Sequence, residues 1–119
     1  MMQGEHTLFK RRIVITGVGA LTPLGNSAAD TWKEICKGKS GIRRITKFDC
    51  TGYATKIAGE LKIFDAHNFV SKKELRKLDD FIIYALAAAE MAVADSGLVI
   101  DRGNAERVGV IIGSGIGGL

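Results

Sequence analysis

The sequence predicts an α/β fold, because short apolar runs alternate with segments of helical periodicity along its 119 residues. Two runs, "RRIVITGVG" (Arg11–Gly19) and "RVGVII", have the continuous apolar character of strands that are covered on both faces. Two segments between them carry helix start and stop signals. The expected order is strand, helix, short strand, long helix, strand. These elements are expected to belong to one domain that covers residues 11–119 and follows a loose tail at residues 1–10.

The first helix is expected after the glycine- and proline-marked loop "GALTPLGN". Ser27 is placed to cap its start, with Asp30 three residues later as a variant of the capping box. Trp32 and Ile35 are expected to face the interior. Gly38 is expected to end the helix, because glycine readily adopts the left-handed conformation found there.

The second helix has the stronger signals. It follows the stretch "KGKSGIRRITKFDCTGY", which is expected to be an irregular surface segment, and a short strand at Tyr53–Leu61. Ser71 and Glu74 form a capping box at its start. The helical pattern continues to Ser96, and Gly97 is expected to terminate it.

Most of this long helix lacks a polar face. The stretch "FIIYALAAAEMAVA" is apolar or small almost all round, which is typical of a helix buried inside a large protein. The last strand then ends at a glycine-rich turn with no following element. We therefore expect the chain to be the front part of a longer protein, whose remainder is absent or is supplied by another chain.

The glycine-rich turn allows two interpretations. Gly113, Gly115 and Gly118 match the spacing G-x-G-x-x-G after a strand, which is the pattern of a dinucleotide-binding loop. That fingerprint also needs a helix and an acidic residue about twenty positions later. The favoured interpretation is a tight turn that lets backbone approach backbone or a buried ligand.

A basic cluster lies at the start of the long helix. Its members are Lys72, Lys73, Arg76 and Lys77. Cations are unfavourable at a helix N-terminus, and Lys73, Arg76 and Lys77 would share one helical face. The cluster is either a solvated face balanced by Glu74 and Asp80, or a docking patch for an acidic partner. Nucleic acid is disfavoured as the partner, because no aromatic residues are interleaved with the basic ones.

Composition and charge narrow the class of protein. The apolar and charged fractions, 46% and 25%, are ordinary for a soluble globular domain, and the net charge of +4 does not by itself indicate nucleic acid. The N-terminus lacks the apolar core of a signal peptide, and no apolar segment is long enough to span a membrane. We therefore expect a cytoplasmic protein.

No catalytic group can be argued from the residues alone. Cys36 and Cys50 are too few for a disulfide framework and are expected to be free thiols; Cys36 is interpreted as a small packed side chain. His6 lies in the tail, and His67 lies in a loop or short turn, without the spacing of a metal site. We expect no active site, no metal and no cofactor in this chain.

Four stretches, taken together, resemble the start of one enzyme family. They are "RRIVITGVGALTPLGNSAADTWKEICKGKSGI", "FDCTGYATKIAGEL", "SKKELRKLDDFIIYALAAAEMAVADSGL" and "RVGVIIGSGIGGL". In this order they are similar to bacterial β-ketoacyl-acyl-carrier-protein synthases, most of all to type II, the elongating condensing enzymes of fatty acid synthesis. The resemblance covers Arg11–Leu119. It implies part of the first half of a thiolase-like α-β-α-β-α fold, incomplete in this chain and usually homodimeric.

The resemblance also implies a reaction, a decarboxylative Claisen condensation. In the family a cysteine holds the acyl chain as a thioester, and two histidines assist decarboxylation of malonyl-acyl-carrier protein. The carbanion that forms then attacks the thioester. The family's cysteine and histidines lie beyond Leu119, so this chain alone is expected to be inactive.

Two sets of site residues follow from the resemblance. Ile116 matches the residue that lines the acyl-chain pocket near the dimer interface, which favours the tight-turn interpretation over a nucleotide site. Lys73, Arg76 and Lys77 match the basic cluster on which the family docks its acidic carrier protein, loaded with an acyl or malonyl group. Neither nucleic acid nor a membrane is expected as a partner. The alternatives are a non-enzymatic module whose basic helix binds an acidic protein and, more weakly, a nucleotide-binding half-domain.

Overall fold

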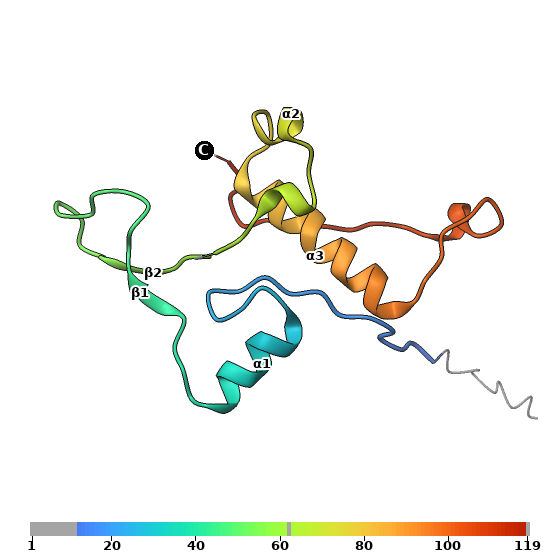
Figure 1. Cartoon of the computed structure of the whole chain (residues 1–119), viewed down its shortest axis with the longest axis horizontal. Coiled ribbons are helices and arrows are strands. Elements are labelled where there is room, and N and C mark those ends of the chain that lie inside the picture. Colours follow the sequence, from blue (N-terminus) through green and yellow to red (C-terminus); the bar gives the residue numbers. More distant parts are fainter. Residues whose placement is uncertain (1–11, 62, 119) are drawn as a thin grey trace, which may run out of the picture.

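The computed structural model describes residues 12–61 and 63–118, in which short helices and a small hairpin are joined by long irregular segments (Figure 1). The elements are α1 (Ala28–Cys36), β1 (Ile42–Arg44), β2 (Ile57–Gly59), η1 (Ala66–Asn68), α2 (Lys72–Leu75), α3 (Asp80–Ser96) and η2 (Ala105–Arg107). The expected tail, residues 1–10, lies outside the described residues, as do Arg11 and Leu119. The described chain contains both helices and strands, in agreement with the predicted α/β class.

Helix α1 begins where the sequence predicts. Ser27 is its N-cap, and the Ser27 Oγ accepts a hydrogen bond from the backbone N–H of Asp30 at 3.0 Å. Gly38 follows the helix with a φ of 68°, which is the left-handed conformation expected there. The prediction that Trp32 and Ile35 face the interior is wrong for the described chain. Their side chains are 66% and 49% exposed, because the described residues leave that face of α1 uncovered.

The only sheet in the described residues is a two-stranded antiparallel hairpin of β1 and β2, in which Ile42 lies opposite Gly59. Strand β2 confirms a strand within the predicted range Tyr53–Leu61, although it is shorter. Strand β1 lies in the stretch predicted to be irregular. Its sequence does not alternate, so its conformation depends on backbone pairing with β2. The pairing continues past the strand, where the N–H of Ile45 donates to the carbonyl of Lys56 at 3.0 Å.

The single helix predicted after Ser71 is two helices, α2 and α3. Ser71 caps α2 as predicted, and its Oγ accepts a hydrogen bond from the backbone N–H of Glu74. Helix α2 ends at Leu75, and after a short turn the chain is extended at Asp79, which has a ψ of 154° and is the N-cap of α3. Asp79 and Asp80 explain the break, because aspartate favours N-cap positions over helix interiors. Gly97 ends α3 with a φ of 65°, which confirms that prediction.

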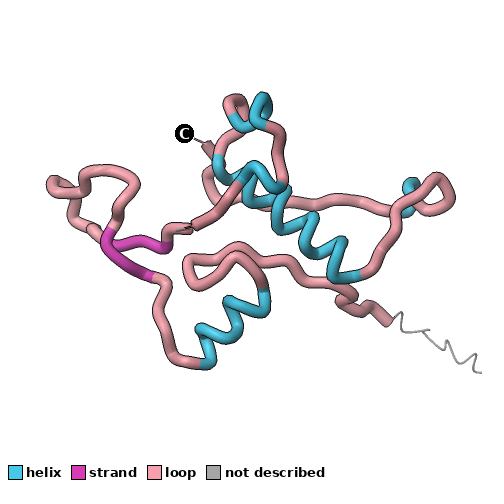
Figure 2. The backbone as a smooth tube through the Cα atoms, in the orientation of Figure 1, coloured by secondary structure: helices cyan, strands magenta, loops and turns pink. Residues whose placement is uncertain are grey.

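Two segments are predicted to be strands, residues 11–19 and 107–112. Arg107 is the last residue of η2, and residues 12–19 and 108–112 have no regular secondary structure and appear as long loops in Figure 2. A strand needs a neighbour for its backbone hydrogen bonds, and the described residues supply none to either segment. Their apolar side chains are correspondingly exposed: Ile13 is 93% and Ile111 is 99% exposed. The strand prediction is therefore wrong for the described chain, although the apolar pattern on which it rested is present.

Both segments nevertheless lie along α3. A Cβ atom added to Gly17 would lie 2.5 Å from the backbone nitrogen of Ser96, and one added to Gly19 would lie 2.8 Å from that of Ala92. Residues 109–113 border a hollow together with alanines of α3. Glycine is required where the first segment crosses the helix, because any larger residue would overlap the helix backbone.

The described residues form only a small core. The buried side chains are those of Cys50, Val70, Ile83 and Ala87, so α3 buries only two of its residues fully. The accessible surface is 10535 Å², whereas a compact monomer of this mass exposes roughly 6300 Å². The radius of gyration is 20.1 Å, against about 13 Å for a compact domain of about 100 residues. As expected, this chain does not cover its own apolar helix.

Within the described residues, no helix has the length and apolar character needed to cross a bilayer.

Candidate functional site

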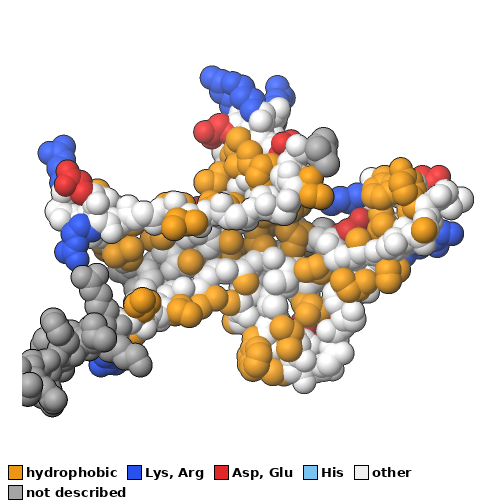
Figure 3. Space-filling view, turned by 180° about the vertical axis from the view of Figure 1, so that it is seen from behind, with side chains coloured by type: hydrophobic (Ala, Val, Ile, Leu, Met, Phe, Trp, Pro, Cys, Tyr) orange, Lys and Arg blue, Asp and Glu red, His pale blue; other side chains and the backbone are white. Residues whose placement is uncertain are grey.

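The basic cluster of Lys72, Lys73, Arg76 and Lys77 lies on and just after α2, at a tip that projects from the rest of the chain. Figure 3 shows Lys and Arg side chains gathered there. All four residues are exposed, and Lys72, Lys73 and Arg76 together line a shallow hollow. The prediction that Lys73, Arg76 and Lys77 share one helical face is wrong, because α2 ends at Leu75. Arg76 is its C-cap, and Lys77 lies in the turn that follows.

The two acidic residues expected to balance this cluster have other partners. Glu74 interacts with the capping residue, because the Ser71 Oγ donates to its carboxylate. The carboxylate of Asp80 forms an ion pair with Lys47 at 2.7 Å. No ion pair among the described residues includes a cation of the basic cluster. The four cations of the cluster are therefore exposed and form no ion pair among the described residues.

The ion pair of Lys47 and Asp80 ties the loop after β1 to the start of α3. The hydroxyl of Tyr84 also donates to the Asp80 carboxylate, at 3.1 Å, and the Lys47 ammonium lies 5.9 Å from the centre of the Tyr84 ring. The hydrogen bond from Lys47 lowers the pKa of Asp80, and the same bond raises the pKa of Lys47. Sequence reasoning missed this contact, because 33 residues separate its partners.

The glycine turn, residues 113–118, lies against the N-terminal end of α3. Gly117 has a φ of 79°, and a Cβ on it would lie 3.5 Å from the ring of Phe81. A Cβ on Gly118 would overlap the carboxyl group of Asp79, 2.5 Å from its Cγ. Ile116 is 77% exposed, so the described residues do not enclose it.

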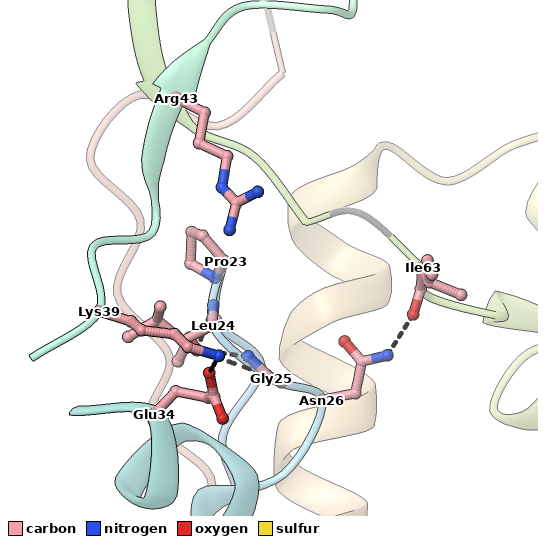
Figure 4. A pocket seen from close by; sticks show the side chains of 9 residues that line it. Pro23, Leu24, Gly25, Asn26, Glu34, Lys39, Arg43 and Ile63 are labelled. Atoms are coloured by element: carbon pink, nitrogen blue, oxygen red, sulfur yellow. Dashed lines mark hydrogen bonds and ion pairs between the residues drawn. The ribbon is translucent and has the colours of Figure 1, made fainter. Parts of the chain in front are cut away.

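A separate hollow of about 240 Å³ lies between α1, β1 and the loop at residues 22–26 (Figure 4). Arg43 points into it from β1, and Lys39 pairs with Glu34 at its edge. Hydrogen bonds from Lys37 and Lys39 lower the pKa of Glu34 to about 2. The Asn26 side chain closes one side of the hollow by donating to the carbonyl of Ile63. The lining contains no nucleophile paired with a base, so we interpret it as a structural hollow.

The remaining candidate groups are dispersed. Cys36 and Cys50 are free thiols, as predicted. Cys50 is buried, but Cys36 is exposed, so its interpretation as a packed side chain is wrong: it lies on the uncovered face of α1. His67 is exposed in η1, where its backbone N–H donates to Asp65, and His6 lies outside the described residues. The described His, Cys, Asp and Glu residues form no group that could hold a metal ion.

Comparison with known proteins identifies the family. The family model described as the N-terminal domain of beta-ketoacyl synthase matches residues 10–119. The 3-oxoacyl-(acyl-carrier-protein) synthase 2 of Vibrio harveyi is 53% identical over 110 residues, 92% of this chain and 26% of that protein. The same enzyme of Synechocystis is 46% identical over 112 residues, 94% of this chain and 27% of that protein.

A solved structure gives the same result for the fold. The ishigamide ketosynthase/chain length factor aligns with a TM-score of 0.65 and 34% sequence identity, over 72% of this chain and 21% of that chain. The chain spans about a quarter of the length of the curated relatives it matches. On this evidence the chain belongs to the beta-ketoacyl synthase family and corresponds to part of its N-terminal domain.

Proposed function

We propose that the chain is the N-terminal part of a 3-oxoacyl-acyl-carrier-protein synthase that elongates acyl chains in fatty acid synthesis. The observation that carries this proposal is the identity of about half the residues, over 92% of the chain, to enzymes of that name from Vibrio harveyi and Vibrio cholerae. The reaction is a decarboxylative Claisen condensation, in which the carbanion from malonyl-acyl-carrier protein attacks an acyl-enzyme thioester. This transfers the acyl group and releases carbon dioxide.

The catalytic cysteine and histidines belong, in this proposal, to the part of the enzyme outside this chain. The chain by itself is then inactive as a synthase. The described cysteines and histidine support this division, because they lie apart from one another and form no cluster. The whole enzyme would be a cytoplasmic homodimer with the layered thiolase-like fold, of which this chain is one part.

The docking surface for the acidic carrier protein is assigned to Lys73, Arg76 and Lys77. Their exposure supports this role, and so does the engagement of the neighbouring acidic residues with other partners. Charged rim contacts of this kind mainly raise the association rate and select partners of opposite charge. The interaction should therefore weaken steeply as salt concentration rises.

The acyl pocket is assigned to the glycine turn, with Ile116 on its wall. In the described chain Ile116 is exposed, so the other walls of the pocket would come from the rest of the enzyme. The turn and the basic cluster both lie at the N-terminal end of the α2–α3 pair. In this proposal the carrier protein and the acyl chain both bind at that end of α3.

Measuring acylation by intact mass tests whether the catalytic residues lie outside this chain. The chain is incubated with a long-chain acyl-carrier protein, alone and with the remaining three quarters of the Vibrio harveyi relative supplied as a second chain. We expect no acylation of this chain alone and acylation of the second chain when both are present. Acylation of this chain alone would place the nucleophile at Cys36 or Cys50 and overturn the proposal. Carrier binding without acylation of either chain would favour a non-enzymatic binding module.

Charge reversal tests the docking surface. The double variant Arg76→Glu, Lys77→Glu should lose carrier binding at least tenfold in a titration at low salt. The matched control, Lys33→Glu with Lys56→Glu, makes the same change in net charge at exposed positions away from α2. An equal loss in both variants would show that only net charge matters, and the assignment of Lys73, Arg76 and Lys77 would then be wrong.

A further inference from the structure

Lys47 lies in the loop after β1, and its side chain reaches the start of α3, just beyond the basic cluster in the chain. Its ammonium group donates to the carboxylate of Asp80 at 2.7 Å, and the hydroxyl of Tyr84 donates to the same carboxylate. The side chains of Lys47 and Asp80 are 52% and 64% exposed, and exposed ion pairs add little to stability. The larger consequence of this pair is electrostatic, because it neutralises a carboxylate that follows four cations in the chain.

Residues 71–80 would be nearly balanced in charge without Lys47. They contain the four cations of the basic cluster and the three carboxylates of Glu74, Asp79 and Asp80, which gives a net charge of +1. The ion pair cancels the charge of Asp80, so the segment together with Lys47 carries +2. The hydrogen bond that joins the pair lowers the pKa of Asp80 and raises that of Lys47, so both groups are charged at neutral pH.

Asp80 is close enough to the basic cluster for its charge to matter there. Lys77 is three residues before Asp80, so their Cα atoms are at most about 11 Å apart, at about 3.8 Å per residue. This span is comparable with the Debye length of about 10 Å at 0.1 M salt. A carboxylate released from Lys47 would therefore attract Lys77 and Arg76, and it would lower the positive potential that an acidic partner meets.

The loop that carries Lys47 is itself fixed by hydrogen bonds. The carboxylate of Glu60 accepts from the backbone N–H of Lys47 at 3.1 Å and from the backbone N–H of Thr46 at 3.0 Å. It also accepts from the Thr46 hydroxyl at 2.8 Å. Glu60 directly follows β2, so the pairing of β1 with β2 brings it to this loop. The hairpin therefore fixes the backbone from which the Lys47 side chain reaches Asp80.

We propose that Lys47 is a positioning residue for carrier docking, which binds the Asp80 carboxylate and so keeps Arg76 and Lys77 available to an acidic carrier protein. The inference rests on the proposed docking function and deepens it, because it adds a residue of the hairpin to the surface assigned to α2. Lys47 acts through Asp80 and does not touch the carrier. Its removal should therefore weaken docking only while residue 80 carries a negative charge.

A double-mutant cycle tests this dependence, with affinities measured by titrating the whole chain with acyl-carrier protein at low salt. Lys47→Met should weaken carrier binding about threefold, which lies in the range that exposed charge pairs contribute. In an Asp80→Asn background the same substitution should leave the affinity unchanged, because no carboxylate remains for Lys47 to bind. An equal loss in the two backgrounds would overturn the inference, since Lys47 would then act by its own charge, by contact with the carrier or by fixing its loop.

Two controls separate this effect from net charge. Lys33→Met removes the same charge from α1, where Lys33 is exposed and forms no ion pair among the described residues, and it should bind the carrier like the wild type. Asp95→Asn removes a carboxylate about 22 Å further along α3, at 1.5 Å per residue. In that background Lys47→Met should keep its full loss. An equal loss in Lys33→Met, or no loss in the Asp95→Asn background, would overturn the inference.

A conservative variant and the wild type complete the test. Lys47→Arg keeps a cation that can bind Asp80, so it should retain wild-type affinity, and circular dichroism checks that each variant keeps its helices. A loss in Lys47→Arg equal to that in Lys47→Met would contradict the role of the charge. Wild-type affinity in Lys47→Met would overturn the inference alone. No carrier binding by the wild-type chain would overturn the docking assignment together with the inference.

Discussion

Replacing Gly17 with alanine tests whether the segment at residues 12–20 is packed on α3. A Cβ at this position would lie 2.5 Å from the backbone nitrogen of Ser96 and 2.7 Å from its Cβ, and closer still to the carbonyl of Ala92. A Cβ atom is essentially never found closer than 3.0 Å to an atom outside its own residue and its chain neighbours, so the segment must move outward by at least 0.5 Å, the difference from 2.5 Å. Overpacking of this kind costs about 1–3 kcal/mol.

The movement should also break a neighbouring contact. The backbone N–H of Val18 donates to the carboxylate of Asp95 at 2.9 Å, and this bond links the segment to α3. We expect exchange of the Val18 amide and of the last turn of α3 to quicken roughly 5- to 150-fold, the factor that corresponds to that cost. Native-state exchange reports such local opening directly.

The control for this experiment is Gly109→Ala, in the other segment beside α3. A Cβ there has nothing within 4 Å, so the variant carries the general effect of replacing glycine without the overlap. If Gly17→Ala and Gly109→Ala exchange equally at Val18, the segment is not packed on α3 and the reasoning is refuted.

Three further predictions follow from the exposed surface, the ion pair and the helix ends. The surface of 10535 Å² exceeds that of a compact monomer by roughly 4200 Å², so the chain should self-associate in analytical ultracentrifugation; a sharply two-state monomer would contradict this. Since the folded-state pKa of Asp80 is lowered and that of Lys47 is raised, their bond stabilises the fold at intermediate pH. Its contribution should be lost as pH falls below about 3.9 towards the folded-state pKa of Asp80, and also as pH rises through the folded-state pKa of Lys47. The free energy of unfolding of Lys47→Met should therefore fall less on acidification than that of the wild type, and an equal fall would refute this. Finally, Gly97→Ala should destabilise the end of α3 by about 1 kcal/mol, because alanine is strained at positive φ. Gly52→Ala should not destabilise the chain, because Gly52 does not have a positive φ and a Cβ there would have nothing within 4 Å. Thermal melts of the two variants test this.

The helix ends could be predicted because their signals are local. Ser27 and Ser71 cap α1 and α2 through N–H groups three residues away, and Gly97 ends α3 through its own backbone conformation. The break at Asp79 was equally local, and the pair of aspartates after Leu78 could have revealed it. The apolar residues keep their helical spacing on both sides of the break, so periodicity predicts one continuous helix.

The strands could not be placed from the sequence. Apolar runs at residues 11–19 and 107–112 mark segments that suit a sheet, but a strand exists only where another strand accepts its hydrogen bonds. The described chain offers that pairing to β1 and β2 alone, although β1 carries the weaker pattern. Trp32 is exposed for a similar reason. A side chain is buried only where another part of the protein covers it, and the described residues leave that face of α1 uncovered.

By itself the sequence determined the family, the helix caps and the identity of the basic cluster, all of which depend on residues close together in the chain or on their order along it. The tertiary structure decided what those residues touch. It paired Asp80 with Lys47 across 33 positions and placed Gly118 against Asp79. Contacts between residues so far apart are set by how the chain is folded around α3, which local propensity does not specify.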